Sequence, residues 1–266
     1  MNITIVITTF NRRRKVCDAI GSTLVNFPNA SILVIDDASQ DTTCEWVNKR
    51  YQNSIADGKI RYIRLARNHG VTAAKNIGYM LASTGWVGFL DSDDYFVEGA
   101  GRIFCDFVEG CEIEPALLFF ASQYEDGSIV NTCQTYSLRL TLAGYLSHSS
   151  FGEAITFMNK KLIKMQRPYV SYLRGYEGIG CSRIIHEDFG ATYYCGTPLR
   201  VYVQGDVSQL STGKNFYSRL ATIGKGHQIM AIKFGSAMSC RVRFLYMLKA
   251  KVYQLLGLLL RQKNGN

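Results

Sequence analysis

Short apolar runs alternate with amphipathic segments over the first hundred of the chain's 266 residues, and this alternation is the feature that most constrains the fold. The apolar runs are rich in β-branched side chains and lie at residues 3–8, 31–35, 60–65 and 86–90. Such runs predict buried strands, with helices between them, the last helix at residues 71–83. This order predicts an α/β fold with a mostly parallel central sheet flanked by helices.

The sequence also predicts where two helices begin and which elements form the second half of the chain. Asn11 is expected to cap the first helix, and Thr42 with Glu45 forms a capping-box pattern before the second. Further strands are expected at residues 117–122, 129–132 and 154–158. A loop and then a helix are expected over residues 172–185, and a basic amphipathic helix over residues 241–261.

Polar clusters directly follow three of the predicted strands, at Thr8-Thr9, at Asp36-Asp37 and at Asp91-Ser92-Asp93. Because ligands of parallel sheets bind beyond the carboxyl ends of the strands, these clusters are expected to meet at one edge. Asp91 and Asp93 offer hard oxygen ligands for Mg²⁺ or Mn²⁺, which usually share such carboxylates with substrate phosphates. A carboxylate at Asp36 or Asp37 can accept a hydrogen bond from a base or a ribose, or can cap a helix.

Four segments together carry a resemblance to family 2 of the glycosyltransferases. They are residues 8–12 (TTFNR), 34–41 (VIDDASQD), 68–78 (NHGVTAAKNIG) and 89–94 (FLDSDD). The resemblance is strong over residues 1–100 and weaker to about residue 210. It implies the GT-A fold, a nucleotide-sugar donor, UDP by default, and inversion at the anomeric carbon. It also implies a domain at residues 1–215, with a Rossmann-like nucleotide-binding half (1–100) and an acceptor-binding half (101–215).

The resemblance assigns roles to individual residues. Asp93 and Asp91 look like the D-x-D pair that holds the metal, with Asp93 the more direct ligand. Residues in the matching motifs are expected at the nucleotide: Thr8, Phe10, Arg12, Asp36, Asp37, Asn68, Lys75 and Ser92. Thr8 and Asp37 are expected at its base.

An inverting transfer needs a base on the acceptor side, and Glu177 is the predicted base. Residues 175–178 (GYEG) are similar to the segment that supplies this carboxylate in the family, although many relatives have Glu-Asp where this chain has Glu-Gly. Asp188 is the second choice. The basic residue often found downstream is missing from residues 206–211, and Lys214 or Arg219 is the expected substitute on the diphosphate.

The formal net charge of +9 favours anionic partners. Residues 216–266 contain no Asp or Glu and interleave Lys and Arg with apolar side chains, which is typical of a surface that contacts an anionic membrane leaflet. We therefore expect a cytoplasmic protein, peripheral on the inner face of the plasma membrane, that acts on a glycan or lipid-linked glycan of a bacterial surface polysaccharide, with no nucleic-acid partner. A helix docked on its own domain or on a second subunit is the alternative for this tail.

Two other functions fit parts of the sequence. A nucleotidyltransferase also uses an α/β sheet, a metal and aspartates, but usually carries a Gly-rich basic loop after the first strand, and residues 8–12 contain no glycine. A basic membrane- or nucleic-acid-binding module with an inactive nucleotide pocket would explain the tail. Such a module has no need of Asp91 and Asp93 at a strand end beside Asp36 and Asp37.

Overall fold

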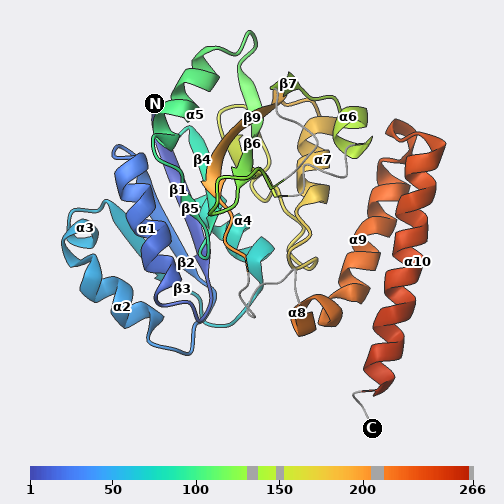
Figure 1. Cartoon of the computed structure of the whole chain (residues 1–266), viewed down its shortest axis with the longest axis horizontal. Helices are drawn as coiled ribbons and strands as arrows, with labels where there is room; N and C mark the ends of the chain where they lie inside the picture. Colours follow the sequence, from blue (N-terminus) through green and yellow to red (C-terminus); the bar gives the residue numbers. More distant parts are fainter. Residues whose placement is uncertain (131–136, 148–152, 205–212, 264–266) are drawn as a thin grey trace.

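The computed structural model describes residues 1–130, 137–147, 153–204 and 213–263 and contains one nine-stranded sheet (Figure 1). Eight strands follow the order β3-β2-β1-β4-β8-β6-β9-β5, and β7 pairs with β9. The first-half strands are β1 (Ile3–Thr9), β2 (Ser31–Asp36), β3 (Ile60–Arg64) and β4 (Trp86–Asp91), and all their mutual pairings are parallel. The four strands predicted in this half are therefore confirmed.

The second half makes the sheet mixed. β6 (Pro115–Gln123) and β9 (Ala191–Val201) run in the direction of β1–β4, whereas β8 (Ile155–Asn159) lies antiparallel between β4 and β6. The two-residue strands β5 (Tyr95–Phe96) and β7 (Leu138–Arg139) are antiparallel to β9. The strand expected at 129–132 falls partly outside the described residues, and Ile129 forms an isolated antiparallel bridge with Gln123.

Two apolar layers cover the sheet. Side chains on alternate positions of β1, such as Ile5 and Ile7, pack with α1 (Lys15–Asn26), α2 (Thr43–Arg50) and α5 (Ala100–Glu109). Val6 faces the other way, toward the layer formed with α4 (Val71–Leu81) and α7 (Gly178–His186). This alternation follows from the two-residue period of a strand and buries both faces of the sheet.

The expected cap of the first helix is wrong, and at the second helix only the position of the N-cap residue is confirmed. The N-cap residue of α1 is Arg14, and the Asn11 side chain instead accepts a 2.7 Å hydrogen bond from the backbone N–H of Gln40. Thr42 is the N-cap residue of α2, but its side chain makes no capping hydrogen bond; its hydroxyl accepts a hydrogen bond from Arg13. Asn11, with φ of 54°, thus joins the loops that follow β1 and β2.

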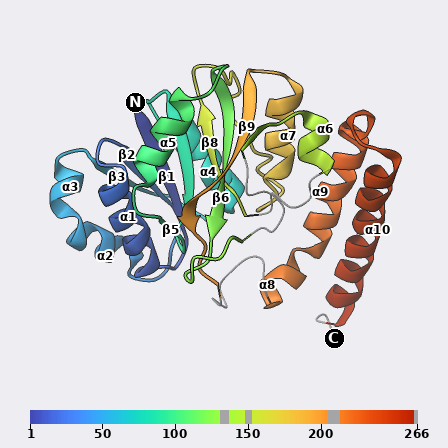
Figure 2. The same ribbon diagram turned by 45° about the horizontal axis from the view of Figure 1, so that its top comes forward.

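A helical hairpin closes the chain beside α7. It consists of α9 (Leu220–Lys233) and α10 (Cys240–Lys263), preceded by α8 (Gly213–Ser218) and joined by a short 3₁₀ turn, η1 (Gly235–Ala237). Figures 1 and 2 show the hairpin next to α6 (Leu142–Ser147) and α7, away from α2 and α3 (Gln52–Ala56). The tail helix predicted at 241–261 is confirmed, and the predicted boundary at residue 215 falls inside α8.

Glycines in two helices provide a test of the packing between α4 and the sheet. A Cβ at Gly78 in α4 would lie 2.3 Å from a methyl of the fully buried Val6, whereas one at Gly21 in α1 would meet its nearest atom at 3.4 Å. Alanine raises intrinsic helix stability by about 1 kcal/mol at either position. We expect Gly78→Ala to destabilise the protein by about 1–3 kcal/mol through overpacking, and Gly21→Ala to be neutral or stabilising. Urea unfolding of both variants measures this, and equal midpoints would contradict the packing described.

Candidate active site

The carboxyl edge of the parallel strands gathers the predicted polar clusters. The register places Thr9 beside Asp36 and Thr8 beside Asp91. The hydroxyls of Thr8, Thr9 and Ser92 are buried here and have no hydrogen-bond partner among the residues that the structure describes. Buried hydroxyls are rarely left without a partner, so this edge has the polar character of a ligand site.

Asp36 has a structural role that corrects its expected place at the nucleotide. Its side chain is fully buried. One carboxylate oxygen accepts the backbone N–H of Ser39 at 2.8 Å, and the other accepts the hydroxyl of Tyr62 at 2.5 Å. With no exposed surface, this carboxylate holds the turn after β2 and does not face a ligand.

Asp37 and Asn68 connect two loops at the same edge. The two Asp37 oxygens each accept a backbone N–H at 2.7 Å, from His69 and from Gly70. The Asn68 amide donates to the backbone oxygen of Asp37 at 3.2 Å. These bonds fix the loop that enters α4 and explain the Asn-His-Gly sequence, since Gly70 has a φ of 90°. A contact of Asp37 or Asn68 with a nucleotide stays a prediction.

Lys75 joins the predicted metal ligand to the predicted base. Its ammonium lies 3.0 Å from a carboxylate oxygen of Asp91 and 2.7 Å from one of Glu177, the N-cap residue of α7. Lys75 was expected at the nucleotide, but its side chain is only 6% exposed and points between these two carboxylates. The structure therefore brings Glu177, distant in sequence, to the edge that carries Asp91.

Arg12 and Phe10 lie in the loop after β1. The Arg12 guanidinium pairs with Asp93 at 2.8 Å, so Asp91 and Asp93 each carry a cationic partner. Phe10 is 41% exposed. The expected contacts of Arg12, Phe10, Thr8 and Ser92 with a nucleotide stay predictions.

The ion pairs set the charge states of this edge. Burial alone would raise the pKa of Asp91, but Lys75, with Arg200 and Arg12, outweighs burial and holds that pKa below its ordinary value. At Asp93 burial dominates over the attraction of Arg12 and raises the pKa. Burial lowers the pKa of Lys75, but Asp91 and Glu177 together reverse this effect and raise it. Lys75 is thus a fixed positive charge at neutral pH.

A buried cluster next to this edge was missed in the sequence. Arg200 on β9 donates to Asp94 at 2.9 Å and to the Ser122 hydroxyl at 2.9 Å, and its guanidinium lies 3.5 Å from Glu153. Burial raises the pKa of Asp94 to about 7, although Arg200 opposes that shift. The available signal was a single arginine in the otherwise apolar run at 199–203, which indicates a buried charged partner.

The residues present suit a divalent cation that takes few protein ligands. Within the described residues, no three His, Cys, Asp or Glu side chains form a metal-holding group. Asp91 and Asp93 nevertheless offer two hard oxygen donors beside the unpartnered Ser92 hydroxyl. Mg²⁺ and Mn²⁺ commonly use one or two carboxylates and complete their coordination with water and phosphate oxygens.

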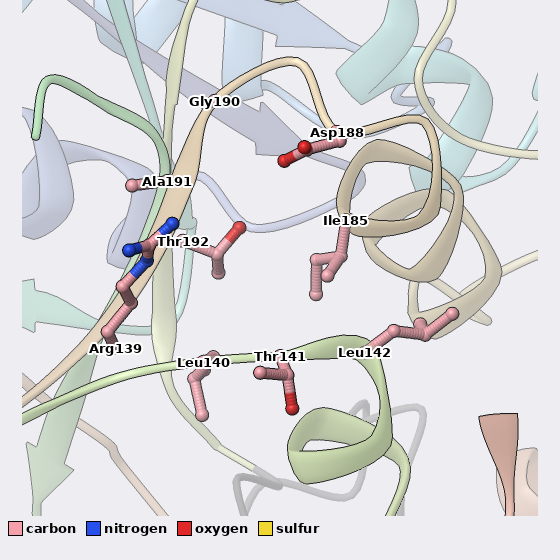
Figure 3. Close-up of a pocket in the computed structure, with 9 residues that line it drawn as sticks. All are labelled: Arg139, Leu140, Thr141, Leu142, Ile185, Asp188, Gly190, Ala191 and Thr192. Carbon is pink, nitrogen blue, oxygen red and sulfur yellow. The ribbon is translucent and has the colours of Figure 1, made fainter.

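Asp188, the second choice for the base, is not at this edge. It lines a separate cavity of about 360 Å³ with Thr192 and Ile185 (Figure 3). Thr192 is in register, through β6 and β8, with Val87 near the start of β4, whereas Asp91 ends that strand. Asp188 therefore lies toward the amino edge of the sheet, because it precedes β9, and it does not join Asp91, Asp93 and Glu177.

Replacement of Arg200 tests the buried cluster. We expect Arg200→Met to cost about 3–5 kcal/mol, because it leaves Asp94 buried without its cation. Arg102→Met is the matched control: its pair with Asp106 is exposed, and its loss costs about 0–1 kcal/mol. Since the folded pKa of Asp94 is already raised, protonation relieves the unpaired charge at low pH, and the loss should be larger at pH 8 than at pH 6. Urea unfolding at both pH values measures this, and similar losses in the two variants would contradict it.

The first part of the chain is similar in sequence to known glycosyltransferases. Residues 4–102 match the family model for glycosyl transferase family 2. An uncharacterized glycosyltransferase of Rickettsia felis is 34% identical over 108 residues, which is 40% of this chain and 17% of that protein. WfaP of Escherichia coli, a UDP-Glc:alpha-D-GlcNAc-diphosphoundecaprenol beta-1,3-glucosyltransferase, is 31% identical over 96 residues, 36% of each chain. The matches thus cover well under half of these relatives.

Solved structures match the chain over nearly its whole length. S. aureus TarS, residues 1–349 with UDP-GlcNAc, superposes with a TM-score of 0.64 at 14% identity, covering 99% of this chain and 92% of that one. The mannosyltransferase PcManGT of Pyrobaculum calidifontis, with GDP-Man and Mn²⁺, gives a TM-score of 0.61 at 12% identity, covering 95% and 69%. These likenesses establish the expected GT-A fold. Residues 4–102 of this chain thus resemble glycosyl transferase family 2, and the chain as a whole has the fold of these glycosyltransferases.

Proposed function

We propose that the chain is an inverting glycosyltransferase that moves a sugar from a nucleoside-diphosphate sugar to an acceptor hydroxyl. The proposal rests on the two ion pairs of Lys75, which connect the carboxylates of Asp91 and Glu177 at the carboxyl edge of the sheet. A single displacement requires a base for the acceptor hydroxyl and positive charge at the leaving group, and this link places a candidate base close to a candidate metal ligand.

The chemistry follows from the positions of these groups. Glu177 takes the proton of the acceptor hydroxyl while the acceptor oxygen attacks the anomeric carbon. The new carbon–oxygen bond forms as the bond to the diphosphate breaks on the opposite face, and the nucleoside diphosphate leaves with the bonding electrons. A bound Mg²⁺ or Mn²⁺, held by Asp93 and Asp91, supplies charge neutralisation for that leaving group. Lys75 and Arg12 place further positive charge at the same edge.

We infer a UDP-sugar donor and a lipid-linked glycan acceptor from the matched relatives. TarS has been solved with UDP-GlcNAc, and the name of WfaP specifies UDP-Glc and a diphosphoundecaprenol-linked sugar. Other relatives are succinoglycan and minor teichoic acid biosynthesis proteins. The product we propose is accordingly a bacterial surface polysaccharide, made on the cytoplasmic face of the membrane.

The outer face of α10 supports peripheral contact with that membrane. Ala250 and Gly257 of α10 are buried against α9, where a Cβ at Gly257 would lie 3.0 Å from the Ala221 backbone nitrogen. On the other side, eight large apolar side chains are 42–64% exposed: Phe244, Leu245, Leu248, Val252, Leu255, Leu256, Leu258 and Leu259. No described helix has the length and apolar character needed to cross a membrane.

We propose that this face of α10 binds a lipid bilayer, because the charged residues around it are basic. Exposed Arg241, Lys249 and Lys251 are interleaved with its apolar residues, and residues 216–266 carry no acidic side chain. A helix with this pattern lies in the interface of an anionic leaflet, with apolar side chains among the acyl chains and cations at the headgroups. Association with a second copy of the chain would instead bury like charges against each other.

Substitution of the proposed metal ligand and base separates their roles. We expect Asp93→Ala to lose metal-dependent donor binding and transfer. Glu177→Gln should keep donor binding and lower turnover by about 10²- to 10⁴-fold, the usual contribution of a general base. Titration calorimetry with UDP and Mn²⁺, and release of UDP from a panel of UDP-sugars with lipid-linked acceptors, give the two readouts.

Two controls make that experiment specific. Glu187→Gln changes the other glutamate at an end of α7, and Asp188→Asn changes the carboxylate in the separate cavity; both should keep transfer. Loss of UDP binding in Glu177→Gln would argue against its role as base. Thermal stabilisation by polyanions such as heparin, without any response to UDP and Mn²⁺, would favour a binding module over an enzyme.

Paired substitution on α10 tests the membrane contact. The parent protein should sediment with phosphatidylglycerol-containing vesicles, and Leu248→Glu with Leu255→Glu should weaken binding at least tenfold, because burying one leucine contributes about 1.5–3 kcal/mol. Val25→Glu, at a 76% exposed site on α1, is the control. Unchanged vesicle binding, or a shift of the parent protein to a dimer that the double variant abolishes, would overturn the membrane assignment.

A further inference from the structure

The segment that carries Glu177 has no regular secondary structure of its own. Residues 171–177 form turns between Tyr169 and the start of α7. The Glu177 backbone oxygen accepts the N–H groups of Gly180 and Cys181 in the first turn of α7, and the rest of the segment depends on contacts with neighbouring elements. Among the elements that supply those contacts are α4 on one side and α9 on the other.

The contacts from α4 involve polar side chains of the family-matching half. The Asn76 amide donates to the backbone oxygen of Tyr169 at 2.8 Å and to the hydroxyl of Ser171 at 3.0 Å, and its oxygen accepts the Tyr169 N–H. Together with the Lys75–Glu177 ion pair, these bonds fix the segment to the sheet.

The contacts from the α9 side begin at Arg219, the N-cap residue of α9. Its guanidinium donates to the backbone oxygens of Arg174 and Gly175, at 2.8 and 3.0 Å. A side chain at Gly175, whose φ is 66°, would collide with this guanidinium. Burial lowers the pKa of Arg219, and the nearby Glu177 carboxylate opposes that shift. Leu173 and Ile179 add an apolar cluster with Met230 of α9.

Tyr176, the residue next to Glu177, contacts α9 both through its ring and through its hydroxyl. Its ring lies against the backbone of Gly226 in α9, where a Cβ would come within 2.6–2.7 Å of three ring atoms. Its hydroxyl is 2.9 Å from Nδ1 of His227. The His227 ring is enclosed further by Tyr246 and Tyr253 of α10. Burial, with Lys249 as a lesser cause, lowers the pKa of His227 to about 4, so the ring is neutral at pH 7.

The geometry points to Tyr176 and His227 as positioning residues for Glu177, so that the α9–α10 hairpin braces the base. This inference rests on the proposed role of Glu177. The Tyr176 ring on Gly226 sets how far the segment lies from α9, and the hydrogen bond to His227 sets its rotation. Small misplacement of a reacting group is costly, since about 1 Å of displacement can lower turnover by about a hundredfold. The hairpin that presents the apolar face of α10 therefore also determines the position of the base.

Variants that remove one partner of the Tyr176–His227 hydrogen bond test this inference. Tyr176→Phe removes only the hydroxyl, and His227→Phe removes its ring-nitrogen partner; the amide of His227→Asn can replace Nδ1 and is the rescue variant. Tyr253→Phe is the control: it removes the hydroxyl of an α10 ring that packs on His227 and keeps the ring itself. Hydrogen exchange of the peptide covering residues 172–180, affinity for UDP with Mn²⁺, melting temperature, and turnover in the UDP-sugar panel are measured for each.

We expect faster exchange in residues 172–180 and a turnover loss of at least about tenfold in Tyr176→Phe and His227→Phe, with unchanged UDP affinity and recovery in His227→Asn. The double variant should lose no more than either single variant, because the two side chains form one contact. Parent-like exchange and turnover in Tyr176→Phe overturn the inference, as does loss through global unfolding alone, seen as lowered melting temperature and lowered UDP affinity together. If Glu177→Gln retains transfer, the proposed base has failed instead, and the exchange data still report whether the brace exists.

Discussion

The ion pairs of Lys75 are the interaction on which the rest of the site depends. A buried ammonium is costly unless its charge is compensated, and here two carboxylates from different parts of the chain compensate it. Asp91 ends a central strand, and Glu177 begins a helix from the second half of the chain. The need to satisfy one buried charge thus ties the two halves of the chain together at the point where a donor and an acceptor would have to meet.

The sheet places several site residues at one edge, and the helices around it position the Glu177 carboxylate there. Six long strands run in one direction, so their carboxyl ends present Thr8, Asp91 and the loops after β1 and β2 together. The second carboxylate does not come from the sheet; it sits on an irregular segment held between α4 and α9. The brace from α9 belongs to the same hairpin whose far side is apolar and basic, which couples the proposed membrane contact to the proposed catalytic geometry.

Much of the first half could be predicted, because its signals are local. Strand periodicity and the polar residues at strand ends located the edge, and Asp91 with Asp93 stood out by position. Asp36 was misplaced because a carboxylate that faces a ligand and one that bonds Ser39 and Tyr62 look the same in sequence. Lys75 was expected at the nucleotide, and its pairs with Asp91 and Glu177 could not be read from the sequence. Arg200 was missed, since its partners Asp94 and Glu153 are distant in sequence and only burial reveals the need for them.

The sequence by itself determined the α/β order, the family resemblance of its first hundred residues and the basic, apolar character of the tail, because periodicity, motif spacing and composition are properties of short stretches. The tertiary structure decided which carboxylates share a cation, that Asp188 lies at a separate cavity, and that Tyr176 rests on Gly226 beside His227. Those facts depend on contacts between residues far apart in the chain, where the cost of burying unpaired charge and the space available to a ring select one arrangement.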